Sequence, residues 1–578
     1  MLKRQAPAFC RKQSYDRFSW SSLSGKGFPS SLSWVTDKQE SGVFSNECHE
    51  VDPLKSFSVI VFVLVVLIQM VGVFDHSLWT PDEPREAQII REMADSGNYL
   101  IPTLGGKPFL EKPPLYYLLG IVIYKYLGDW YQESARLASV LFGLATLAVV
   151  FFTFRRLSGK TEAGFTTLVL ATMPLFFIST HKILVDVGLM FFITAAMCSF
   201  LLAYKGQFRI GYYVFWLCLA LAFLVKGIKG LAIPMAGIIF FMVAQRDYAL
   251  IRRCNIFQGS AIILIIMLIW AWALYIHGGY DFVYEFYVYN QIGRFIPAGT
   301  IYTGGHVRPF YFYLLDVPVQ TLPWSVFLYP AYKVLDRKEV GLRFLFCWIL
   351  GGLVLLSMAS TKREIYFLPM FPAIAGLVGI WMSGLLERQM TSLENACMKG
   401  VLILIALAAA VFPLVYIKLG GFWLTAELLF ILTAGALIFM WRNYQSAMPY
   451  IPVMVMAFTL IVWIPAMFPL IDQVKSYKPI YQEIGKRVEG KKVMGYKLNE
   501  TVEALAPFYG GFHVKNIEDM ASFYKAFHNR SADFIIVLPE RLTWRMKNIV
   551  IPTNATLVYE GGGKKNREIE LWEMNSSP

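Results

Sequence analysis

The sequence predicts a polytopic α-helical membrane protein with a small α/β domain at its C-terminal end. Hydrophobic residues make up 56% of the 578 positions and charged residues only 16%, which is more apolar surface than a water-soluble core can bury. Apolar segments of the length that crosses a bilayer recur along the chain. Residues 472–578 contain short runs of β-type residues instead, and we predict a separate domain there.

Residues 1–55 are rich in serine, mixed in charge and without apolar periodicity. Such a segment has too little apolar surface to form a packed core. We expect either a disordered cytoplasmic tail or a stretch that precedes the true start of the chain, for which Val51 is the alternative start. No cleavable signal peptide precedes Phe57.

We predict a transmembrane domain at residues 56–471, because its apolar segments approach the roughly 20 residues that cross a hydrocarbon core. The predicted spans, about 13 in all, are 57–74, 134–154, 162–180, 187–203, 210–224, 230–244, 258–276, 311–332, 342–358, 364–384, 399–418, 421–441 and 449–470. One further apolar run, Leu115–Leu127, is too short to cross, and we expect it to lie on the membrane surface as a helix.

The distribution of basic residues orients these spans. With the N-terminus inside, Lys and Arg are enriched on the cytoplasmic side, as the positive-inside rule requires; the loops concerned are 155–161, 204–209, 245–257 and 333–341. The outer side then holds loops 75–133, 277–310 and 359–363 and the domain at 472–578. In that domain we predict strands at Lys492–Tyr496, Asp533–Leu538, Thr556–Tyr559 and Glu568–Glu573.

Composition argues against several classes of protein. The formal net charge of +13 would suit nucleic acid, but the basic residues lie in short clusters between apolar segments, so we expect no nucleic-acid partner. The 7 cysteines include no Cys-x-x-Cys pair, which argues against a disulfide framework or a thiolate metal site. No internal repeat is visible, whereas secondary transporters are typically built from repeats.

The first outer loop carries two charged motifs. Asp82 follows the first span closely, and a carboxylate at the membrane interface is costly unless a cation, a metal or a substrate compensates it. Asp82 is therefore a candidate functional acid; the alternative is that it caps a helix beginning at Pro84. Further along, Glu111 and Lys112 precede two prolines and face the same aqueous cleft, with a simple surface ion pair as the alternative.

Asp186 lies at the outer junction of two spans and is a second acid at the depth of Asp82. Its alternative role is to cap the helix that follows. Two Lys or Arg clusters, at Lys226–Lys229 and at Lys362-Arg363, lie where the topology disfavours cations. They suggest a fixed anion such as a lipid phosphate, or else an error in the topology.

The outer loop at 277–310 holds Arg294 and His306, and it could close over a substrate. A histidine in such a loop is more often a surface residue than a metal ligand.

Taken together, these motifs resemble the lipid A aminoarabinose transferases and their relatives. The matching segments, in order, are Asp82-Glu83-Pro84-Arg85, Phe109-Leu110-Glu111-Lys112-Pro113-Pro114, Asp186, Lys226-Gly227, Arg294-Phe295 and Lys362-Arg363-Glu364-Ile365-Tyr366-Phe367-Leu368-Pro369. That family shares the C-type glycosyltransferase fold with the protein O-mannosyltransferases. Its helical membrane domain and outer C-terminal domain cover this chain from residue 57 onward.

The resemblance implies that Asp82 and Asp186 are the functional acids. It places the following residues around the sugar and the carrier phosphate: Arg85, Glu111, Lys112, Lys226, Arg294, Lys362, Arg363 and Tyr366. A divalent metal ion is the cofactor that the resemblance suggests, with Glu111 and His306 as candidate ligands. Two positions depart from the family: Phe109 replaces a residue that is often Tyr, and Gln291 or Asn290 replaces a metal-binding His.

We therefore expect an inverting pentosyl- or hexosyltransferase of the bacterial inner membrane, embedded in membrane lipids, with its active site on the periplasmic face. It would transfer a sugar from a polyprenyl-phosphate carrier to lipid A or another periplasmic acceptor. One alternative is an enzyme like the protein O-mannosyltransferases, whose outer domain presents a protein. A lipid-sugar flippase is the other, but it would need polar groups deep within the spans, whereas the charges here lie at one face.

Overall fold

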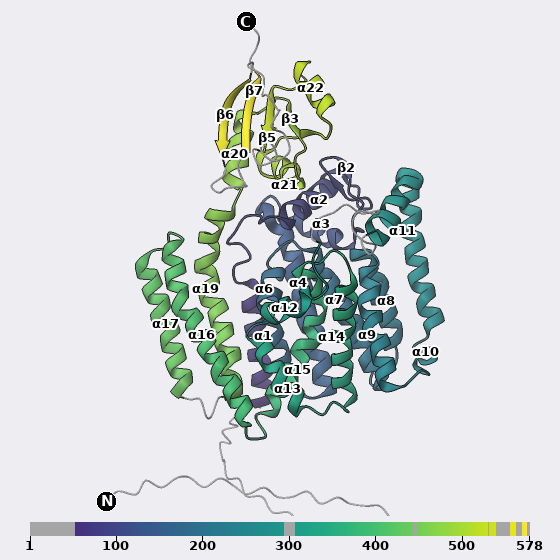
Figure 1. The fold of residues 1–578 in the computed structure, drawn as a ribbon, viewed down its shortest axis with the longest axis vertical. Helices are drawn as coiled ribbons and strands as arrows, with labels where there is room; N and C mark the ends of the chain where they lie inside the picture. The colour runs from purple at the N-terminus through teal and green to yellow at the C-terminus, as the bar shows by residue number, and fades with distance from the viewer. Residues whose placement is uncertain are drawn as a thin grey trace, which may run out of the picture. The chain divides into compact units, whose positions relative to one another are not determined.

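The computed structural model describes residues 53–293, 307–442, 448–529, 531–538, 555–561 and 569–574. The predicted tail at residues 1–55 lies outside the described residues, apart from 53–55, which begin the first helix. Residues 52–578 form one compact unit, in which a body of long helices is followed by a five-stranded sheet near the C-terminal end (Figure 1). The predicted boundary at residues 471 and 472 stays a prediction.

Apolar sequence forms the helices of the body. They are α1 (Pro53–Met70), α4 (Arg136–Leu157), α5 (Lys160–Ala171), α6 (Pro174–Thr180), α7 (Val185–Tyr204), α8 (Gly211–Lys226), α9 (Lys229–Gln245), α10 (Leu250–Arg253), α11 (Ile256–Tyr284), η2 (Glu285–Ile292), α12 (Phe312–Gln320), η3 (Trp324–Phe327), α13 (Leu328–Val334), α14 (Val340–Met358), η4 (Glu364–Met370), α15 (Phe371–Gly384), α16 (Ser392–Lys418), α17 (Trp423–Arg442), η5 (Met448–Tyr450) and α19 (Ile451–Lys475).

The chain is a multi-pass membrane protein by the length and apolar composition of these helices. In the described part of the chain, seven helices are long and apolar enough to cross a membrane, and the bent pair α5 and α6 makes an eighth if it is one span. The other predicted spans correspond to shorter or broken apolar helices. The predicted α-helical membrane fold is confirmed, while the number of about 13 crossings stays a prediction.

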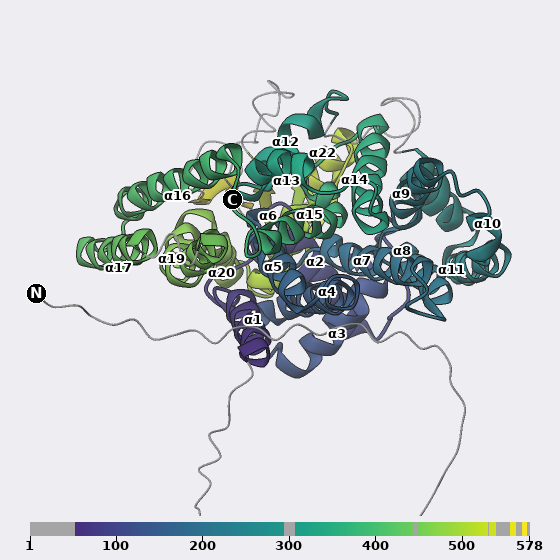
Figure 2. The same ribbon diagram turned by 90° about the horizontal axis from the view of Figure 1, so that it is seen from below.

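The body has a densely packed centre and apolar flanks. Gly351 on α14 meets α9 so closely that an added Cβ would lie 2.5 Å from the backbone nitrogen of Gly237, and such close helix contact is typical of membrane interfaces. At one side lie α10 and α11, and at the opposite side α16 and α17 (Figure 2). Their outer side chains, such as Trp272 on α11 and Phe430 on α17, are exposed apolar groups suited to lipid.

One predicted span, 311–332, is not a single helix. The structure breaks it into α12, η3 and α13. Pro323 lies directly before η3, and Pro330 follows the end of η3 by three positions. Both explain breaks, because each removes a backbone N–H donor and crowds the preceding turn. Pro318, in contrast, lies inside α12. Similarly, the span predicted at 162–180 bends by 69° between α5 and α6, where Pro174 starts the second helix.

The loop between α1 and α4 contains a small folded layer of its own. It holds α2 (Asp82–Ser96), β1 (Thr103–Leu104), β2 (Lys107–Pro108), α3 (Leu115–Leu127) and η1 (Gln132–Ala135). Helix α3 has the bounds that we predicted for the surface helix, and it is among the apolar helices of 10–17 residues. Figure 1 places α2 and α3 at the end of the body that is nearest the sheet.

The C-terminal part is a mixed α/β domain, as predicted. Its sheet has the strand order β4-β3-β5-β7-β6, with β3 parallel to β4 and β5, and β7 antiparallel to β5 and β6. The elements are α20 (Lys478–Arg487), β3 (Val493–Tyr496), α21 (Glu500–Leu505), η6 (Ala506–Gly510), β4 (Val514–Ile517), α22 (Met520–His528), β5 (Phe534–Val537), β6 (Ala555–Gly561) and β7 (Ile569–Met574). The four predicted strands correspond to β3, β5, β6 and β7, whereas β4 was not predicted.

Side chains of the sheet domain bind directly to the loop layer. Tyr509 on η6 donates through its hydroxyl to Glu133 Oε1 at 2.7 Å and accepts from the backbone N–H of Leu78 at 2.9 Å. Lys478 Nζ lies 3.1 Å from Glu133 Oε1, and Arg91 on α2 donates to the carbonyl of Phe508 at 3.0 Å. The loop layer is thus held between the helical body and the sheet domain.

Candidate active site

The first turn of α2 carries the first acid of the site. Asp82 accepts a bidentate pair of hydrogen bonds from Arg363, with Arg363 Nη1 at 3.0 Å from Asp82 Oδ1. Arg85, one turn along α2, places Nη2 3.4 Å from the same oxygen. The N-cap position of α2 is Pro81, and no side chain caps it. Asp82 therefore does not have the capping role that the sequence left open; its carboxylate holds two arginines.

Glu86 is a second acid on α2 that was not among the predicted site residues. It lies one turn after Asp82 on the same helix face and is only 1% exposed. Lys112 Nζ and Arg85 Nη2 both donate to Glu86 Oε1, the latter at 3.0 Å, and the hydroxyl of Tyr117 on α3 donates to Glu86 Oε2 at 2.6 Å. One buried carboxylate thus holds two of the predicted phosphate-binding cations.

The aromatic ring of Phe109 completes this part of the site. It lies 5.4 Å from the Arg85 guanidinium carbon and 5.8 Å from Lys112 Nζ, measured to the ring centroid. A ring face at that distance attracts a cation without any hydroxyl group. Phe109 can therefore support both cations although the related family often has Tyr at this position.

Burial and charge act in opposite directions on the pKa values here. Burial raises the pKa of the Asp82 carboxyl, but the hydrogen bond and charge of Arg363 and the charge of Arg85 outweigh it and hold that pKa below its ordinary range. Burial also raises the pKa of Glu86, whereas the charges of Lys112 and Arg85 bring it below the ordinary value. Both acids are therefore ionised at neutral pH.

Asp186 and Lys226 form the other half of the site. Asp186 is buried in the first turn of α7, and its Oδ2 lies 2.5 Å from Lys226 Nζ at the C-terminal end of α8. The N-cap position of α7 is Leu184, so capping is not the role of Asp186. In the part of the chain that the structure describes, Asp186 Oδ1 is buried and has no hydrogen-bond partner. A polar group of a ligand could supply one.

Tyr366 stands between the two halves. Its ring centroid lies 4.9 Å from Lys226 Nζ and 4.0 Å from Lys229 Nζ. Its position on η4 follows Arg363 closely, and the negative charge of Asp186 acts on the Arg363 guanidinium. The two ion-paired halves therefore belong to one electrostatic cluster.

The adjacent residues Lys362 and Arg363 point to different places. Lys362 Nζ donates to the carbonyls of Arg308, at 3.1 Å, and Ala359, and so it ties two backbone segments together. Arg363 reaches Asp82 instead. The structure thus brings Arg363 into the cluster and does not bring in Lys362, because side chains alternate on the extended backbone at this point.

Glu111 lies beside the cluster, and its charge acts on both Arg85 and Lys112. Asn290 and Gln291, one of which was predicted to replace the family's histidine, both bond to neighbouring backbone. Asn290 donates to the carbonyl of Leu110 at 3.2 Å, and Gln291 Oε1 accepts from the backbone N–H of Ile228 at 3.0 Å. Gly227 is required here, because it has a φ of 66° and an added Cβ would lie 2.0 Å from Gln291 Oε1.

Arg294 and His306, both predicted site residues, lie outside the described residues. Among the residues that are described, no three His, Cys, Asp or Glu side chains gather where they could hold a metal ion. Asp82, Glu86 and Asp186 are instead neutralised by Lys or Arg. This described donor set does not fit a divalent metal ion, and ligation by Glu111 and His306 stays a prediction.

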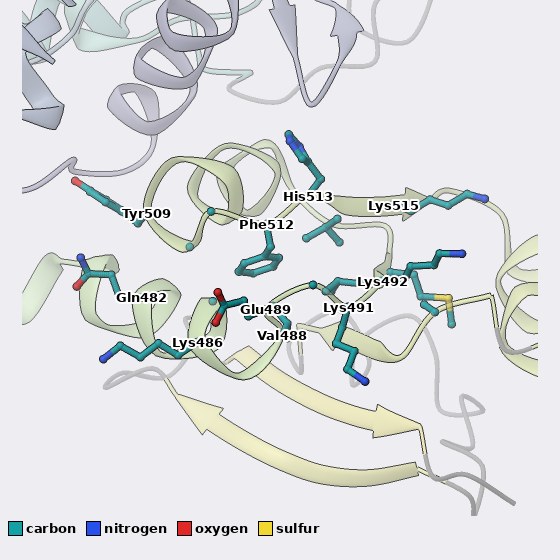
Figure 3. A pocket seen from close by; sticks show the side chains of 18 of the residues that line it. Gln482, Lys486, Val488, Glu489, Lys491, Lys492, Tyr509, Phe512, His513 and Lys515 are labelled. Carbon is teal, nitrogen blue, oxygen red and sulfur yellow. The ribbon is translucent and has the colours of Figure 1, made fainter. Parts of the chain in front are cut away.

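A large cavity lies elsewhere, in the sheet domain between α20, β3 and β4. It has a volume of about 1080 Å³ and contains none of the predicted site residues. Figure 3 shows Phe512 near its middle, with the ammonium ends of Lys486, Lys491, Lys492 and Lys515 extending outward rather than converging. No acid and cation set comparable to the Asp82 cluster lines this cavity, so the cluster remains the candidate active site.

The same fold occurs in two solved structures. The crystal structure of ArnT from Cupriavidus metallidurans bound to undecaprenyl phosphate superimposes with a TM-score of 0.73 at 20% identity, covering 90% of this chain and 98% of that one. The apo state of the same protein gives a TM-score of 0.71 at 19% identity, with the same coverage. This likeness shows the C-type glycosyltransferase fold.

Sequence comparisons agree. Residues 54–287 match the family model described as dolichyl-phosphate-mannose-protein mannosyltransferase. The undecaprenyl phosphate-alpha-4-amino-4-deoxy-L-arabinose arabinosyl transferase of Pectobacterium carotovorum subsp. carotovorum is 31% identical over 343 residues, which is 57% of this chain and 60% of that protein's length. An uncharacterized protein of Aquifex aeolicus is 26% identical over 473 residues, covering 79% of this chain and 87% of that protein. The resemblance inferred from the motifs is confirmed.

Proposed function

We propose that this protein is a glycosyltransferase of the bacterial inner membrane that moves a sugar from a polyprenyl-phosphate carrier to a periplasmic acceptor, with lipid A as the preferred candidate. The observation that carries the proposal is the cluster itself. Arg85, Lys112, Lys226 and Arg363 come from four separate segments and meet Asp82, Glu86 and Asp186. Helix α2, which carries two of these acids, lies at the end of the helical body nearest the sheet domain (Figure 1).

The cations suit the chemistry of the leaving group. When the bond between the sugar and the carrier breaks, the carrier phosphate takes up the electron pair and gains negative charge. Fixed cations that point at this oxygen stabilise the transition state more than the ground state. Arg85 and Lys112 both contact Glu86, whereas Lys226 pairs with Asp186 and Arg363 with Asp82. A phosphate can bind these cations in addition to their acids or in place of them.

The acids suit the acceptor and the sugar. If the acceptor is a hydroxyl group, Asp82 is the candidate general base, because it is ionised and faces the cluster. If the acceptor is a phosphate, as on lipid A, it is already ionised and needs no base. The open oxygen of Asp186 is the candidate contact for a polar group of the sugar. A single displacement of this kind inverts the anomeric centre.

Two similar proteins support this choice of donor. The transferase of Pectobacterium carotovorum is named for undecaprenyl phosphate-linked 4-amino-4-deoxy-L-arabinose, and the ArnT crystal structure holds undecaprenyl phosphate. The match to the mannosyltransferase family model favours a second candidate, a transfer to protein. Donor chemistry is the same in the two cases, and the acceptor differs.

The test is a transfer assay with purified protein in detergent, using undecaprenyl phosphate-linked aminoarabinose, mannose and hexosamine in turn. Each donor is offered lipid A in one arm and a Ser- and Thr-rich peptide in the other. We expect sugar on lipid A and none on the peptide; the reverse result would favour the second candidate. Mass spectrometry should show that lipid A from a deletion strain lacks one defined sugar mass that lipid A from the parent strain carries. The proposal would be refuted if the two spectra were identical and neither arm of the transfer assay gave a product.

A further inference from the structure

A groove runs along the surface of the helical body between α1 and α4, which lie side by side and both adjoin α5 (Figure 2). Its volume is about 470 Å³. Helix α1 lines it from Ser58 to Val66, and α4 lines it from Leu144 to Phe152. The side chains of Phe62 and Phe152 are 68% and 63% exposed, so the groove opens to the surroundings of the body.

The packing of α1 explains why the groove exists. Near its C-terminal end α1 approaches α4, because a Cβ added to Gly143 would lie 3.1 Å from Gln69 Oε1. Near its N-terminal end α1 packs on α5 instead, where a Cβ added to Gly164 would lie 2.4 Å from Phe57 Cε1. Helices α1 and α4 therefore separate along their length, and Ala148 is too small to fill the space that opens.

Membrane lipid surrounds this groove. Helix α4, together with η1, is one of the helices that are long and apolar enough to cross a membrane. The side chains that line the groove are apolar, apart from Ser58 and Thr167. An apolar groove in a bilayer attracts an acyl chain no more strongly than the neighbouring lipid does, because both are equally apolar. The groove alone therefore accepts a chain of any lipid, and selectivity requires a polar group.

Two arginines supply that group where the groove ends. Arg155 and Arg156 follow Phe152 by three and four positions, so they lie on the same face of α4, one turn beyond the groove. Both side chains are exposed. The sequence that follows adds one more cation, Lys160, and one acid, Glu162. This end of the groove therefore has an excess of positive charge.

The length of α4 places these arginines at one face of the membrane. Helix α4 begins at Arg136, directly after the loop layer that contacts the sheet domain, and its 22 residues extend for about 33 Å. That length crosses the hydrocarbon core, so Arg155 and Arg156 lie at the headgroup level of the face opposite the Asp82 cluster. Guanidinium groups at that level can bind a lipid phosphate directly.

We propose that the groove between α1 and α4 binds an anionic phospholipid from the membrane face opposite the Asp82 cluster. One acyl chain lies in the groove, and the headgroup phosphate contacts Arg155 and Arg156. The arginines select for net negative charge, since phosphatidylcholine carries the same phosphate but cancels its charge with an ammonium group. This site does not depend on the function proposed above.

The test is photolabelling of the purified full-length protein in phosphatidylcholine vesicles. A small share of the lipid is a probe with a photoreactive diazirine on one acyl chain, and the probe is phosphatidylglycerol in one arm and phosphatidylcholine in the other. Peptide mass spectrometry then measures the label in residues 58–66 and 144–152. We expect the phosphatidylglycerol probe to label them about five-fold or more above the other probe. Equal labelling in the wild type overturns the proposal.

The double variant Arg155→Gln with Arg156→Gln removes both charges from the end of the groove. Labelling by the phosphatidylglycerol probe should then fall to the level of the phosphatidylcholine probe. The matched control is Arg209→Gln with Arg252→Gln, which removes two exposed cations from loops predicted on the same membrane face and should keep the wild-type excess. An equal loss in both double variants overturns the proposal, because general surface charge would then explain the selectivity.

The variant Ala148→Phe fills the groove without changing any charge. It should lower the labelling of residues 58–66 and 144–152 by the phosphatidylglycerol probe several-fold. Its control is Ala408→Phe, the same substitution at an exposed alanine of α16, which should label like the wild type. Wild-type labelling in Ala148→Phe overturns the proposal. If the arginine variant does not insert into the membrane, the wild-type comparison and Ala148→Phe still decide.

Competition identifies the occupant of the groove. Unlabelled phosphatidylglycerol should displace the probe from residues 58–66 and 144–152, and undecaprenyl phosphate at the same concentration should displace less. The reverse order overturns the proposal, because the groove would then hold the carrier lipid. A dimeric protein whose groove neither probe labels also overturns it, because a second copy would then cover the groove.

Discussion

Replacing Glu83 by alanine should prevent stable folding, whereas removing an exposed acid of the same helix should not. Glu83 is 1% exposed and points into the body. Its Oε1 accepts from Arg136 Nε at 3.1 Å and from the backbone N–H of Ile183 at 3.0 Å, and its Oε2 accepts from the backbone N–H of Trp79 at 2.8 Å. One side chain thus connects the loop before α2, the start of α4 and the segment before α7.

The magnitude follows from what Glu83→Ala leaves behind. Arg136 is fully buried, and removing the partner of a buried charge costs about 3–5 kcal/mol. Arg136 keeps hydrogen bonds to the carbonyls of Val73, His76 and Ser77, which favours the lower end of that range. Two backbone N–H groups also lose their acceptor, at about 1–3 kcal/mol each. A total of about 5 kcal/mol or more is comparable to the whole net stability of many domains.

The assay is size-exclusion chromatography of detergent-extracted protein, followed by thermal unfolding of any monodisperse fraction. Glu83→Ala should give little or no monodisperse protein, and Glu83→Gln, whose amide oxygen still accepts one N–H, should be intermediate. The matched control is Asp95→Ala, which removes an exposed acid from the same helix and should elute and unfold close to the wild type. A Glu83→Ala protein with wild-type yield and unfolding temperature would refute the reasoning.

Further predictions concern activity, topology and pH. Asp82→Asn should lower transfer to a hydroxyl acceptor by about 100-fold or more; near-wild-type turnover in the reconstituted assay would exclude it as a base. Lys226→Ala should weaken carrier binding by about 1.5–3 kcal/mol, measured as the Kd of undecaprenyl phosphate. The control is Lys333→Ala, which changes a predicted cytoplasmic residue, and an equal Kd in the two variants would contradict a phosphate contact at Lys226. Cysteine at Asp129→Cys should react with an impermeant maleimide from outside, and labelling only from the cytoplasm would show that α3 crosses. Burial and the charge of Arg136 lower the pKa of His76 to about 2, whereas His76 in the unfolded chain takes up a proton near pH 6.5. The free energy of unfolding should therefore fall as the pH drops below about 6.5, by up to about 1.4 kcal/mol per pH unit. A constant free energy of unfolding between pH 6.5 and pH 4.5 would contradict this prediction.

Much of the fold was predictable because membrane helices are long and uniformly apolar, so length and composition alone reveal them. The failures have local causes. The segment 311–332 is apolar throughout, and only its prolines indicate the breaks that the structure shows. Strand β4, with the sequence Val514-Lys515-Asn516-Ile517, is too short and too polar to predict, and it exists because β3 provides a parallel partner.

The candidate site was predictable as a set of charges on one side of the membrane, but its pairing was not. Lys362 and Arg363 are both cationic, and which of them reaches Asp82 depends on the phase of an extended backbone that the sequence does not fix. Glu86 lies in a helix that carries five acids and two arginines, several of them three or four positions apart. Nothing in that pattern distinguishes a surface ion pair from a buried one, because burial depends on where α3 packs.

The bonds between Tyr509, Glu133 and the N–H of Leu78 have a consequence for exchanging parts between related proteins. These atoms belong to segments about 380–430 positions apart in the sequence, and each of them is buried in the contact. A chimera that takes its sheet domain from one parent and its first outer loop from another would pair unmatched partners at this junction. Residues 71–135 and 472–511 should therefore be transplanted together, as one discontinuous module, whenever acceptor preference is moved from one relative to another.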